Sequence, residues 1–341
     1  MPWWTRAFAT TERKERSVSA GALAWARLCR HRLAIFGGIV ILILAFAAAF
    51  APYISPYDPA RSNLRLRFGA PSLKPPPDPR AFPRCTRPRG ILGWPCGVHP
   101  FGTDDLGRDI LTRVLYGGRV SLCVGFTAAL GSTLLGGLLG AVAAYVGGWA
   151  DAGMSRFTDT MLAIPQFPLL LILSGLLASR ELPLAVHLSE LLGAAKSIVV
   201  IVFVITVLSW MPAFRLVRGE VLSLKEREFA LAVKAIGASP ARIILRHLIP
   251  NAFHLLIVQS TLMVGEAILI ESGLSFLGLG IQPPAVSWGN MLSRAQEFLY
   301  YPNGIYIALF PGIFIFLTVL CFNFVGDGLR DALDPRFAHR V

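Results

Sequence analysis

Long apolar runs alternate with polar segments along the chain. They extend over residues 33–51, 120–146, 161–178, 198–214, 255–281 and 305–325. Each is close to the ~20 apolar residues that a helix needs to cross the ~30 Å hydrocarbon core of a bilayer. A helix also satisfies its own backbone hydrogen bonds there. The pattern therefore predicts an all-α, polytopic membrane protein with six transmembrane helices.

The composition agrees with this prediction. Hydrophobic residues make up 54% of the 341 residues and charged residues only 15%, with a mean hydropathy of +0.59. Such a chain is too apolar for a soluble protein of this length. The net charge of +12 would also suit a nucleic-acid-binding protein, but the basic residues gather beside the apolar runs. We therefore expect membrane lipid as a partner and no nucleic acid.

The positions of Lys and Arg predict the orientation. Basic residues are frequent in residues 1–32 and between residues 215 and 246, and six crossings place both segments on the same side, which is the cytoplasm. The segment between the first two runs is also rich in Arg, but it exceeds the ~60 residues over which this rule holds. Both termini are therefore expected in the cytoplasm. The polar leader is too long for an ordinary signal peptide, so the first run is expected to stay as an uncleaved anchor.

The predicted external loop, residues 52–119, contains a stretch crowded with Pro and Arg that suits neither helix nor strand. Cys85 and Cys96 both lie in this stretch. In an oxidising compartment they are candidates for a disulfide, and two unpaired thiols are the alternative. Cys29, Cys123 and Cys321 lie in or beside apolar runs and are expected to be small buried residues. The cysteines and histidines show no metal-ligand spacing, so we expect no metal site.

Residues 228–251, EFALAVKAIGASPARIILRHLIPN, predict two short helices joined by a corner. Gly237 suits the left-handed position that ends a helix, Ser239 suits an N-cap, and Pro240 suits the first position of the next helix. That second helix is expected to end at Pro250. The first helix has an apolar face made of Phe229, Ala232, Val233 and Ile236. This face either packs on the rest of the chain or contacts a partner.

The same stretch resembles the loop that carries the coupling helix in ABC-importer permeases of the dipeptide, oligopeptide and nickel branch. The agreeing residues are Glu228, Ala235, Gly237, Ala238, Ser239, Arg246, His247, Pro250 and Asn251. The general motif of all such importers fits less well, because Leu231 stands where that motif has Glu. Two more stretches resemble this branch, namely HPFGTDDLGRDILTRVLYGGRVSL at residues 99–122 and ESGLSFLGLG at residues 271–280.

The resemblance implies a type I ABC-importer permease fold and a chain divided into segments. These are a cytoplasmic N-terminal segment 1–32, the first transmembrane helix 33–51, the external loop 52–119, a permease core 120–326 with a cytoplasmic coupling loop 217–253, and a cytoplasmic tail 327–341. The residues expected to couple the chain to an ATPase are Glu228, Phe229, Ala232, Val233, Ile236, Gly237, Ala238, Ser239 and Pro240.

The resemblance also implies partners and a location. The partners would be a homologous permease, two ABC ATPase subunits or domains, and an external solute-binding protein, in a bacterial inner membrane. The chain has no Gly-Lys-Ser or Gly-Lys-Thr loop to cradle phosphates, so it is not expected to be an enzyme or to bind a cofactor. ATP and Mg would be bound by the partner ATPases. The expected solute is a di- or oligopeptide, with nickel or another small solute as the alternative within this branch.

A self-sufficient secondary transporter or channel is the alternative from another class. Such a transporter more often contains an internal repeat and more spans, and neither is visible here. A proton relay usually has more intramembrane acids and a basic or His partner within the spans. The fifth run contains two acids, Glu266 and Glu271. We expect Glu266 to line the pathway and Glu271 to support packing or a gate.

Three further features of the residues bear on local structure. Arg156 and Asp159 have the i, i+3 spacing that permits an ion pair at the membrane edge. Thr103, Asp104 and Asp105 could form a cation site, but capping of backbone N–H groups is the expected role. The second run contains Gly136 and Gly140, a small-xxx-small spacing that predicts close packing inside the bundle.

Overall fold

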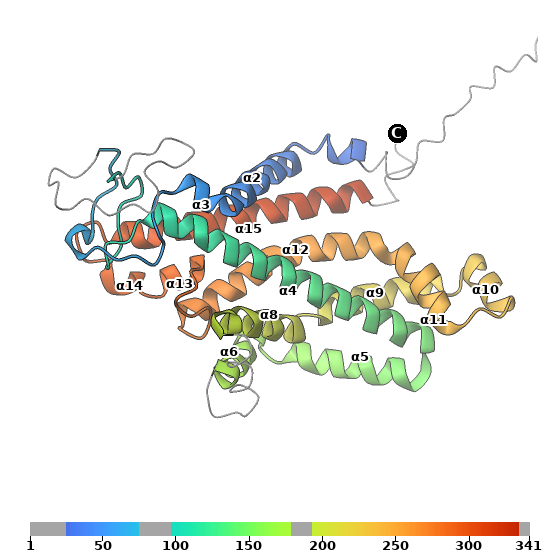
Figure 1. Cartoon of the computed structure of the whole chain (residues 1–341). Helices are drawn as coiled ribbons and strands as arrows, with labels where there is room; N and C mark the ends of the chain where they lie inside the picture. Colours follow the sequence, from blue (N-terminus) through green and yellow to red (C-terminus); the bar gives the residue numbers. More distant parts are fainter. Residues whose placement is uncertain (1–24, 75–96, 179–192, 334–341) are drawn as a thin grey trace, which may run out of the picture.

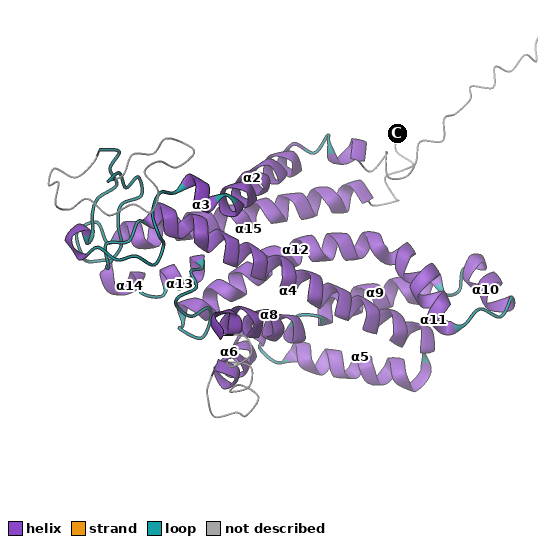
Figure 2. Ribbon diagram, viewed as in Figure 1, coloured by secondary structure: helices purple, strands orange, loops and turns teal. Residues whose placement is uncertain are grey.

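The structure is a computed structural model that describes residues 25–74, 97–178 and 193–333. Within these ranges all regular secondary structure is helical (Figures 1 and 2), and only two isolated β-bridges occur. The α-helices are α2 (Arg32–Ala49), α3 (Ala51–Ile54), α4 (Ile110–Val146), α5 (Gly148–Ala163), α6 (Gln166–Ala178), α8 (Lys196–Leu208), α9 (Met211–Leu224), α10 (Glu228–Ala235), α11 (Pro240–Ile243), α12 (Ile249–Phe276), α13 (Trp288–Leu292), α14 (Ala295–Phe298) and α15 (Ile305–Leu333). The shorter turns are η2 (Leu64–Leu66), η4 (Gly193–Ala195) and the π-helical turn η5 (Ile244–Leu248).

Four of these helices are long and apolar enough to cross a membrane. They are α2, α4, α15 and the continuous helix from α11 through α12. Two further candidates are bent pairs, α5 with α6 at 91° and α8 with α9 at 42°. The chain therefore has four to six candidate spans, and the predicted all-α membrane fold is confirmed. The predicted count of six applies when each bent pair is one span.

The third predicted run, residues 161–178, is not one helix. α5 ends at Ala163, and α6 begins at Gln166 after a sharp bend. Ile164 is extended (φ −82°, ψ 133°) because the ring of Pro165 disfavours helical geometry in the residue before it. The predicted run begins at residue 161, although α5 already begins at Gly148. The sequence pattern misses this start because Asp151, Arg156 and Asp159 interrupt the apolar pattern within α5.

The first and last spans lie side by side and antiparallel. His31 at the start of α2 lies 3.9 Å from Asp331 near the end of α15. A Cβ atom at Gly37 would lie 2.7 Å from the carbonyl oxygen of Cys321, so glycine allows the two backbones to approach. The start of α2, the end of α15 and α10 all lie at one end of the molecule (Figure 1). An even number of crossings produces this arrangement.

α4 lies at the centre of the bundle and packs closely on α9. A Cβ atom at Gly136 would collide with the carbonyl oxygen of Trp210, and one at Gly140 would lie 2.5 Å from the carbonyl oxygen of Phe214. The predicted close packing at this small-xxx-small pair is therefore confirmed.

The opposite end of the molecule is built by the loop before α4 together with α13 and α14. The indole of Trp288 is buried against Gly118, and its Nε1 donates to the carbonyl oxygen of Val114 at 2.9 Å. The hydroxyl of Tyr57 donates to the carbonyl oxygen of Val98 at 2.9 Å. Burial raises the pKa of the Tyr57 phenol above its ordinary value.

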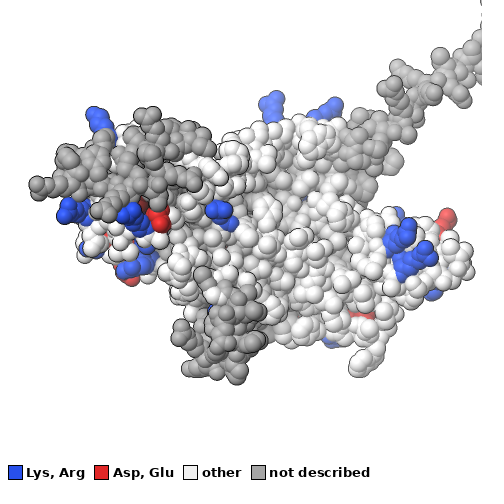
Figure 3. All heavy atoms as spheres, in the orientation of Figure 1, with Lys and Arg blue, Asp and Glu red and all other residues white. Residues whose placement is uncertain are grey.

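Charged side chains on the face shown in Figure 3 lie mostly toward the two ends, and the band between them is almost free of charge. Such a band is expected of a surface that faces lipid or another apolar helix. Cys85 and Cys96 lie outside the described residues, so their pairing stays a prediction. Cys321 is buried as expected, but Cys29 and Cys123 are exposed, which corrects the prediction for these two residues.

Candidate functional site

The coupling loop projects from one end of the bundle, where α10 and α11 form a corner (Figure 1). Gly237 has a φ of +82°, which places it in the left-handed region that favours glycine. Its N–H donates to the carbonyl oxygen of Lys234 at 3.0 Å, and that of Ala238 donates to Val233 at 3.3 Å. This pair of bonds is the Schellman arrangement that ends a helix. The predicted corner at Gly237 is confirmed, with Pro240 at the start of α11.

The predicted apolar face of α10 divides into two faces. Val233 is half-buried and packs with Ala230 against the rest of the loop and the ends of α4 and α9. Phe229, Ala232 and Ile236 point outward, and Ile236 is 84% exposed. The two faces differ because Val233 lies about 100° around the helix from Ala232, on the side of Ala230, which packs on the bundle. The outer face is an apolar surface with no cover from the described part of this chain.

The helix after the corner does not end at Pro250, which corrects the sequence prediction. α11 continues through η5 into α12, and Pro250 lies in the first turn of α12. Proline has no N–H for the preceding turn, and the π-helical turn η5 adapts the backbone just before it. The amide of Asn251 donates to the carbonyl oxygen of His247 at 2.6 Å across this junction. Ser239 occupies the N-cap of α11, but no cap hydrogen bond from its side chain is found in the described residues.

The loop is fixed to the bundle by a small hydrophobic cluster of its own. The cluster consists of Ala141, Ala144, Val217, Val221, Leu224, Ala230, Ile243, Ile244, Leu248, Ala252 and Leu256. Nζ of Lys225 also donates to the carbonyl oxygen of Ala144 at 2.9 Å. The loop is therefore packed on the ends of α4, α9 and α12.

Two ion pairs join α5 to α9 near this loop. Arg218 binds Asp151 through two hydrogen bonds of 2.5 and 2.6 Å, and Arg215 binds Asp159 at 2.6 Å. The sequence spacing permits Asp159 to pair with Arg156, but the carboxylate reaches α9 instead. The partner is 56 residues away in the chain, so sequence spacing gives no sign of it.

Glu271 is fully buried on α12 and sits among serine hydroxyls. Ser275 donates to Oε1 at 2.7 Å, and Ser121 of α4 donates to Oε2 at 3.2 Å. The N–H of Trp288 in turn donates to the hydroxyl of Ser121 at 3.1 Å. These bonds connect α12, α4 and α13, which fits the predicted role in packing.

Glu266 lies on a different face of α12 and is exposed within the apolar span. Leu269, one turn further, is 50% exposed on the same face. Among the described residues no ion pair to Glu266 is found. An acid in this position needs a polar surrounding such as a pathway or a partner chain.

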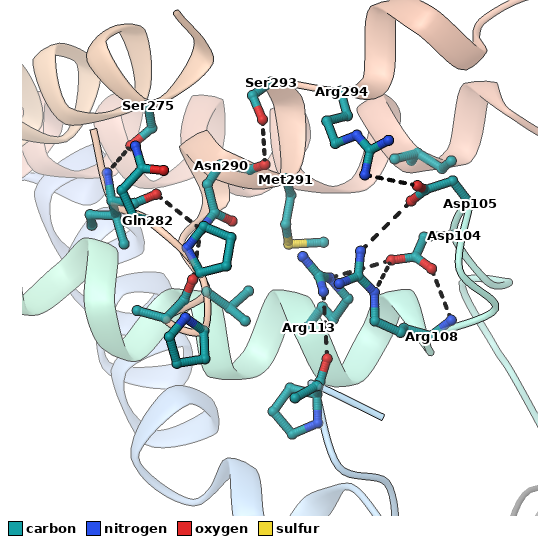
Figure 4. Close-up of a pocket in the computed structure, with 18 of the residues that line it drawn as sticks. Asp104, Asp105, Arg108, Arg113, Ser275, Gln282, Asn290, Met291, Ser293 and Arg294 are labelled. Atoms are coloured by element: carbon teal, nitrogen blue, oxygen red, sulfur yellow. Dashed lines mark hydrogen bonds and ion pairs between the residues drawn. The ribbon is translucent and has the colours of Figure 1, made fainter. Parts of the chain in front are cut away.

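A cavity of about 350 Å³ lies at the opposite end of the molecule (Figure 4). Asp104 pairs with Arg108 at 2.7 Å, and Asp105 pairs with Arg294 at 3.4 Å across the cavity rim. Arg113 is almost fully buried there, 3.6 Å from Asp104. The two aspartates belong to the motif at residues 99–122. The pairing of Asp105 with Arg294 joins residues far apart in the chain, so it is not visible from sequence.

Asp104 caps backbone groups, as expected, whereas Asp105 is found in ion pairs with Arg108 and Arg294. Oδ1 of Asp104 accepts from the N–H groups of Leu106 and Arg108, each at 2.9 Å. The N-cap of α4 itself is Asp109, which accepts from the N–H of Thr112 at 2.7 Å. No group of three or more metal-ligating side chains exists in the ranges that the structure describes.

Comparison with known proteins places the chain in a family. Residues 136–339 match a family model described as the binding-protein-dependent transport system inner membrane component, and residues 19–76 match the N-terminal transmembrane domain of oligopeptide transport permease C. The chain belongs to this permease family. Three relatives illustrate a similarity that covers about nine-tenths of each chain.

The dipeptide transport system permease protein DppC of Alkalihalophilus pseudofirmus is 40% identical over 94% of this chain and 91% of its own. The protein of the same name from Bacillus subtilis is 38% identical over 95% and 88%. The oligopeptide transport system permease protein OppC of Bacillus subtilis is 36% identical over 94% and 92%.

Family membership establishes several of the predictions. The chain is an ABC-importer permease of the DppC and OppC type, an inner membrane component with several spans. It is one part of a system that also has a binding protein, and ATP is hydrolysed on other subunits.

Proposed function

We propose that this permease forms half of an ATP-driven pathway that imports di- or oligopeptides. The proposal rests on the names of its relatives, which are similar over nine-tenths of the chain. The observation that carries the mechanism is the exposed apolar face of α10, held on a rigid corner at one end of the bundle. An uncovered apolar face of this kind suits a protein partner.

The partner at this face would be an ABC ATPase. Phe229, Ala232 and Ile236 would make the contact, while Gly237, Ala238, Ser239 and Pro240 shape the corner. Val233 supports the contact from beneath, and Glu228 begins the helix. Two ATPase subunits or domains would bind ATP and Mg, one beneath this permease and one beneath a homologous permease. Closure of the ATPases would then push α10 and, through its hydrophobic cluster, α9 and α12.

The orientation follows from the same surface. α10, the start of α2 and the end of α15 share one end of the molecule, and this end would face the cytoplasm with both termini (Figure 1). Residues 52–119 would then be external, where a solute-binding protein delivers the peptide. The segments 1–32, 33–51, 120–326, 217–253 and 327–341 keep the roles that the sequence predicts.

The two intramembrane acids would have different roles. Glu266 would face the peptide pathway or the homologous permease, because its side chain is exposed within an apolar span. Glu271 would stabilise the packing of α4, α12 and α13, because serine hydroxyls surround it inside the bundle.

Reconstitution tests the proposal. Vesicles would contain the permease, its homologous permease and the ATPases, with the external binding protein added outside. We expect uptake of labelled dialanine or trialanine that requires ATP and the binding protein, and no uptake of Ni²⁺. Uptake of Ni²⁺ without peptide uptake would favour the nickel alternative. Flux through this chain alone, driven by an ion gradient without ATP, would contradict the importer mechanism.

A further inference from the structure

The two bent spans are interrupted at the same place in the bundle. α5 ends at Ala163 and α6 begins at Gln166, while α8 ends at Leu208 and α9 begins at Met211. A single side chain joins the two interruptions. Nε2 of Gln166 donates to the carbonyl oxygen of Leu208 at 3.1 Å and to the hydroxyl of Ser209 at 2.7 Å.

Pro212 explains why this carbonyl group needs a donor. In a continuous helix the N–H of residue 212 would donate to the carbonyl oxygen of residue 208, four positions earlier. Proline has no N–H, so the carbonyl group of Leu208 loses its backbone partner. Leu208 and Ser209 are both buried, at 9% and 5% exposure, so water does not easily replace the missing donor. Gln166 supplies it from the other bent span.

The helices on one side of these interruptions form a unit. α5 is held to α9 by the Arg218–Asp151 and Arg215–Asp159 pairs. The ring of Phe157 also stacks near Trp210, with centroids 6.4 Å apart. α9 in turn packs on the glycines of α4 and leads to the coupling loop.

The helices on the other side form a second unit. α6 packs on α8 in the main hydrophobic cluster, to which Leu170, Leu177 and Val204 belong. Both units also contact α4 and α12, and the backbone passes directly from one unit to the other at residues 164–165 and 209–210. The amide of Gln166 holds both stretches together.

We propose that Gln166 couples the two bent spans, so that a displacement of α9 by the ATPase is passed to α6 and α8 as one movement. The inference rests on the proposed function, because it assigns the movement to ATP-driven transport. Without the amide, α9 could turn at residues 209–210 while α6 stays in place. Gln166 is thus a positioning residue that acts through the backbone of α8.

The test compares three variants in the reconstituted importer. Gln166→Leu removes both hydrogen bonds at similar size, and Pro212→Ala returns the N–H that a continuous helix would direct at the carbonyl oxygen of Leu208. Thr158→Val is the matched control, because it removes a 2.8 Å bond to the carbonyl oxygen of Met154 that stays within α5. The readouts are the thermal midpoint of the assembled complex and the number of peptides imported per ATP hydrolysed.

We expect Gln166→Leu to lower the ratio of peptide to ATP about fivefold, which is the shift that one buried hydrogen bond gives to a two-state equilibrium. Thr158→Val should leave the ratio unchanged. Adding Pro212→Ala to Gln166→Leu should recover the thermal midpoint but not the ratio. Recovery of both would show that Gln166 only satisfies a carbonyl group, and an unchanged ratio in Gln166→Leu would equally overturn the inference.

A distance measurement tests the coupling role of Gln166 independently of which solute the importer carries. Spin labels at Ile172 on α6 and Leu216 on α9, both exposed, report the geometry of the two units in the assembled complex. We expect the distance distribution to widen at least about twofold in Gln166→Leu, because the two units lose their link. An unchanged distribution would overturn the coupling role of Gln166. Absence of peptide import would instead contradict the proposed function, and the distance measurement can be made in either case.

Discussion

Gly237 ends α10, and its backbone conformation rather than its surroundings limits what can replace it. Apart from its chain neighbours, no atom of the described residues lies within 4 Å of the position that a Cβ would occupy, so a side chain has room. The φ of +82° is nevertheless strained for any other residue, and most strained for a β-branched one. The corner therefore depends on glycine for a local reason.

We predict that Gly237→Val lowers ATP-coupled uptake several-fold while the protein still inserts and assembles. The strain of about 1–2 kcal/mol falls on the corner and tilts α10 against its partner. Gly219→Val is the control, since Gly219 on α9 also has open space around it and an ordinary helical φ. Uptake per ATP in the reconstituted importer measures both variants. Equal uptake in Gly237→Val and wild type would show that the corner does not position the coupling helix.

Glu271 offers a second prediction, on the choice between packing and proton transfer. Glu271→Gln keeps the size, its amide oxygen can accept from one of the hydroxyls of Ser121 and Ser275, and its NH2 group can donate to the other, so we expect near-normal stability and uptake. Glu271→Leu leaves buried hydroxyls without an acceptor and should destabilise the complex by about 1–3 kcal/mol. Thermal unfolding of the purified complex measures this difference. A proton relay predicts instead that Glu271→Gln abolishes transport while the complex stays folded.

The residues that sequence reasoning found and those that it missed differ in one respect. Gly237 and Pro240 act on the backbone within a few residues, so local rules predict them. Gln166 acts on a carbonyl group 42 residues away, and Arg294 acts on a carboxylate far earlier in the chain. Such contacts depend on how helices pack, and a single sequence contains no direct sign of them.

At the scale of elements, close contact between α4 and α9 explains how the coupling loop is held. Gly136→Ala should destabilise the complex by about 2 kcal/mol, because the new methyl group overlaps the backbone of Trp210 and forces the helices apart. Gly38→Ala on α2 is the control, because nothing lies within 4 Å of its Cβ position. Thermal unfolding in detergent measures both. A midpoint in Gly136→Ala as high as in Gly38→Ala would mean that the two helices are not packed this closely.

The two ion pairs between α5 and α9 should contribute unequally. The side chains of Arg218 and Asp151 are 30% and 15% exposed, and those of Arg215 and Asp159 are 53% and 60% exposed. Asp151→Asn should therefore cost about 1–2 kcal/mol, because it breaks a bidentate, partly buried pair. Asp159→Asn should cost less than about 0.5 kcal/mol and less still in high salt. Unfolding midpoints at low and high salt test this order.

The helices also show which features of an element are predictable. Apolar length predicts α2 and α15 well, because each is one unbroken run. Apolar length misplaces the third span. The polar residues of α5 make its first part look unlike a span, and the chain bends at Pro165 between α5 and α6. Pro250 is read as an end, although η5 lets the helix continue past it. A proline shows that a helix is disturbed, but its surroundings decide whether the helix stops.

At the scale of the whole molecule, the bundle leaves apolar helix faces uncovered. Phe126, Leu130, Leu134 and Leu138 form an exposed stripe of four-residue spacing along α4. Lipid or a homologous permease must cover such a stripe, since an exposed apolar surface of this extent is unfavourable in water. The outer face of α10 differs because it lies at an end of the bundle, among the charged residues of the coupling loop (Figures 1 and 3). That difference in surroundings favours a water-soluble protein partner for the outer face of α10, and lipid or an apolar helix for the stripe on α4.

The orientation of the whole chain supplies the last prediction. Arg and Lys are frequent at both ends of the molecule, so charge alone does not decide which end is cytoplasmic. The decisive segments are the short ones, because the positive-inside rule applies to loops shorter than about 60 residues. Of these, the coupling loop lies at the end that bears α10, as does the start of α2, to which residues 1–32 lead in the chain.

Single cysteines at Ser72 and Ser223, in a chain whose native cysteines are replaced by Ser, test this orientation. Ser72 forms a β-bridge with His99 in the loop between the first two spans, and Ser223 is exposed on α9 just before α10. A membrane-impermeant thiol reagent added to intact spheroplasts should label the cysteine at 72 and not the one at 223. Permeabilised cells provide the control, since both positions should then react. Labelling of position 223 from outside would place α10 on the external face, where it could not contact an ATPase that binds cytoplasmic ATP.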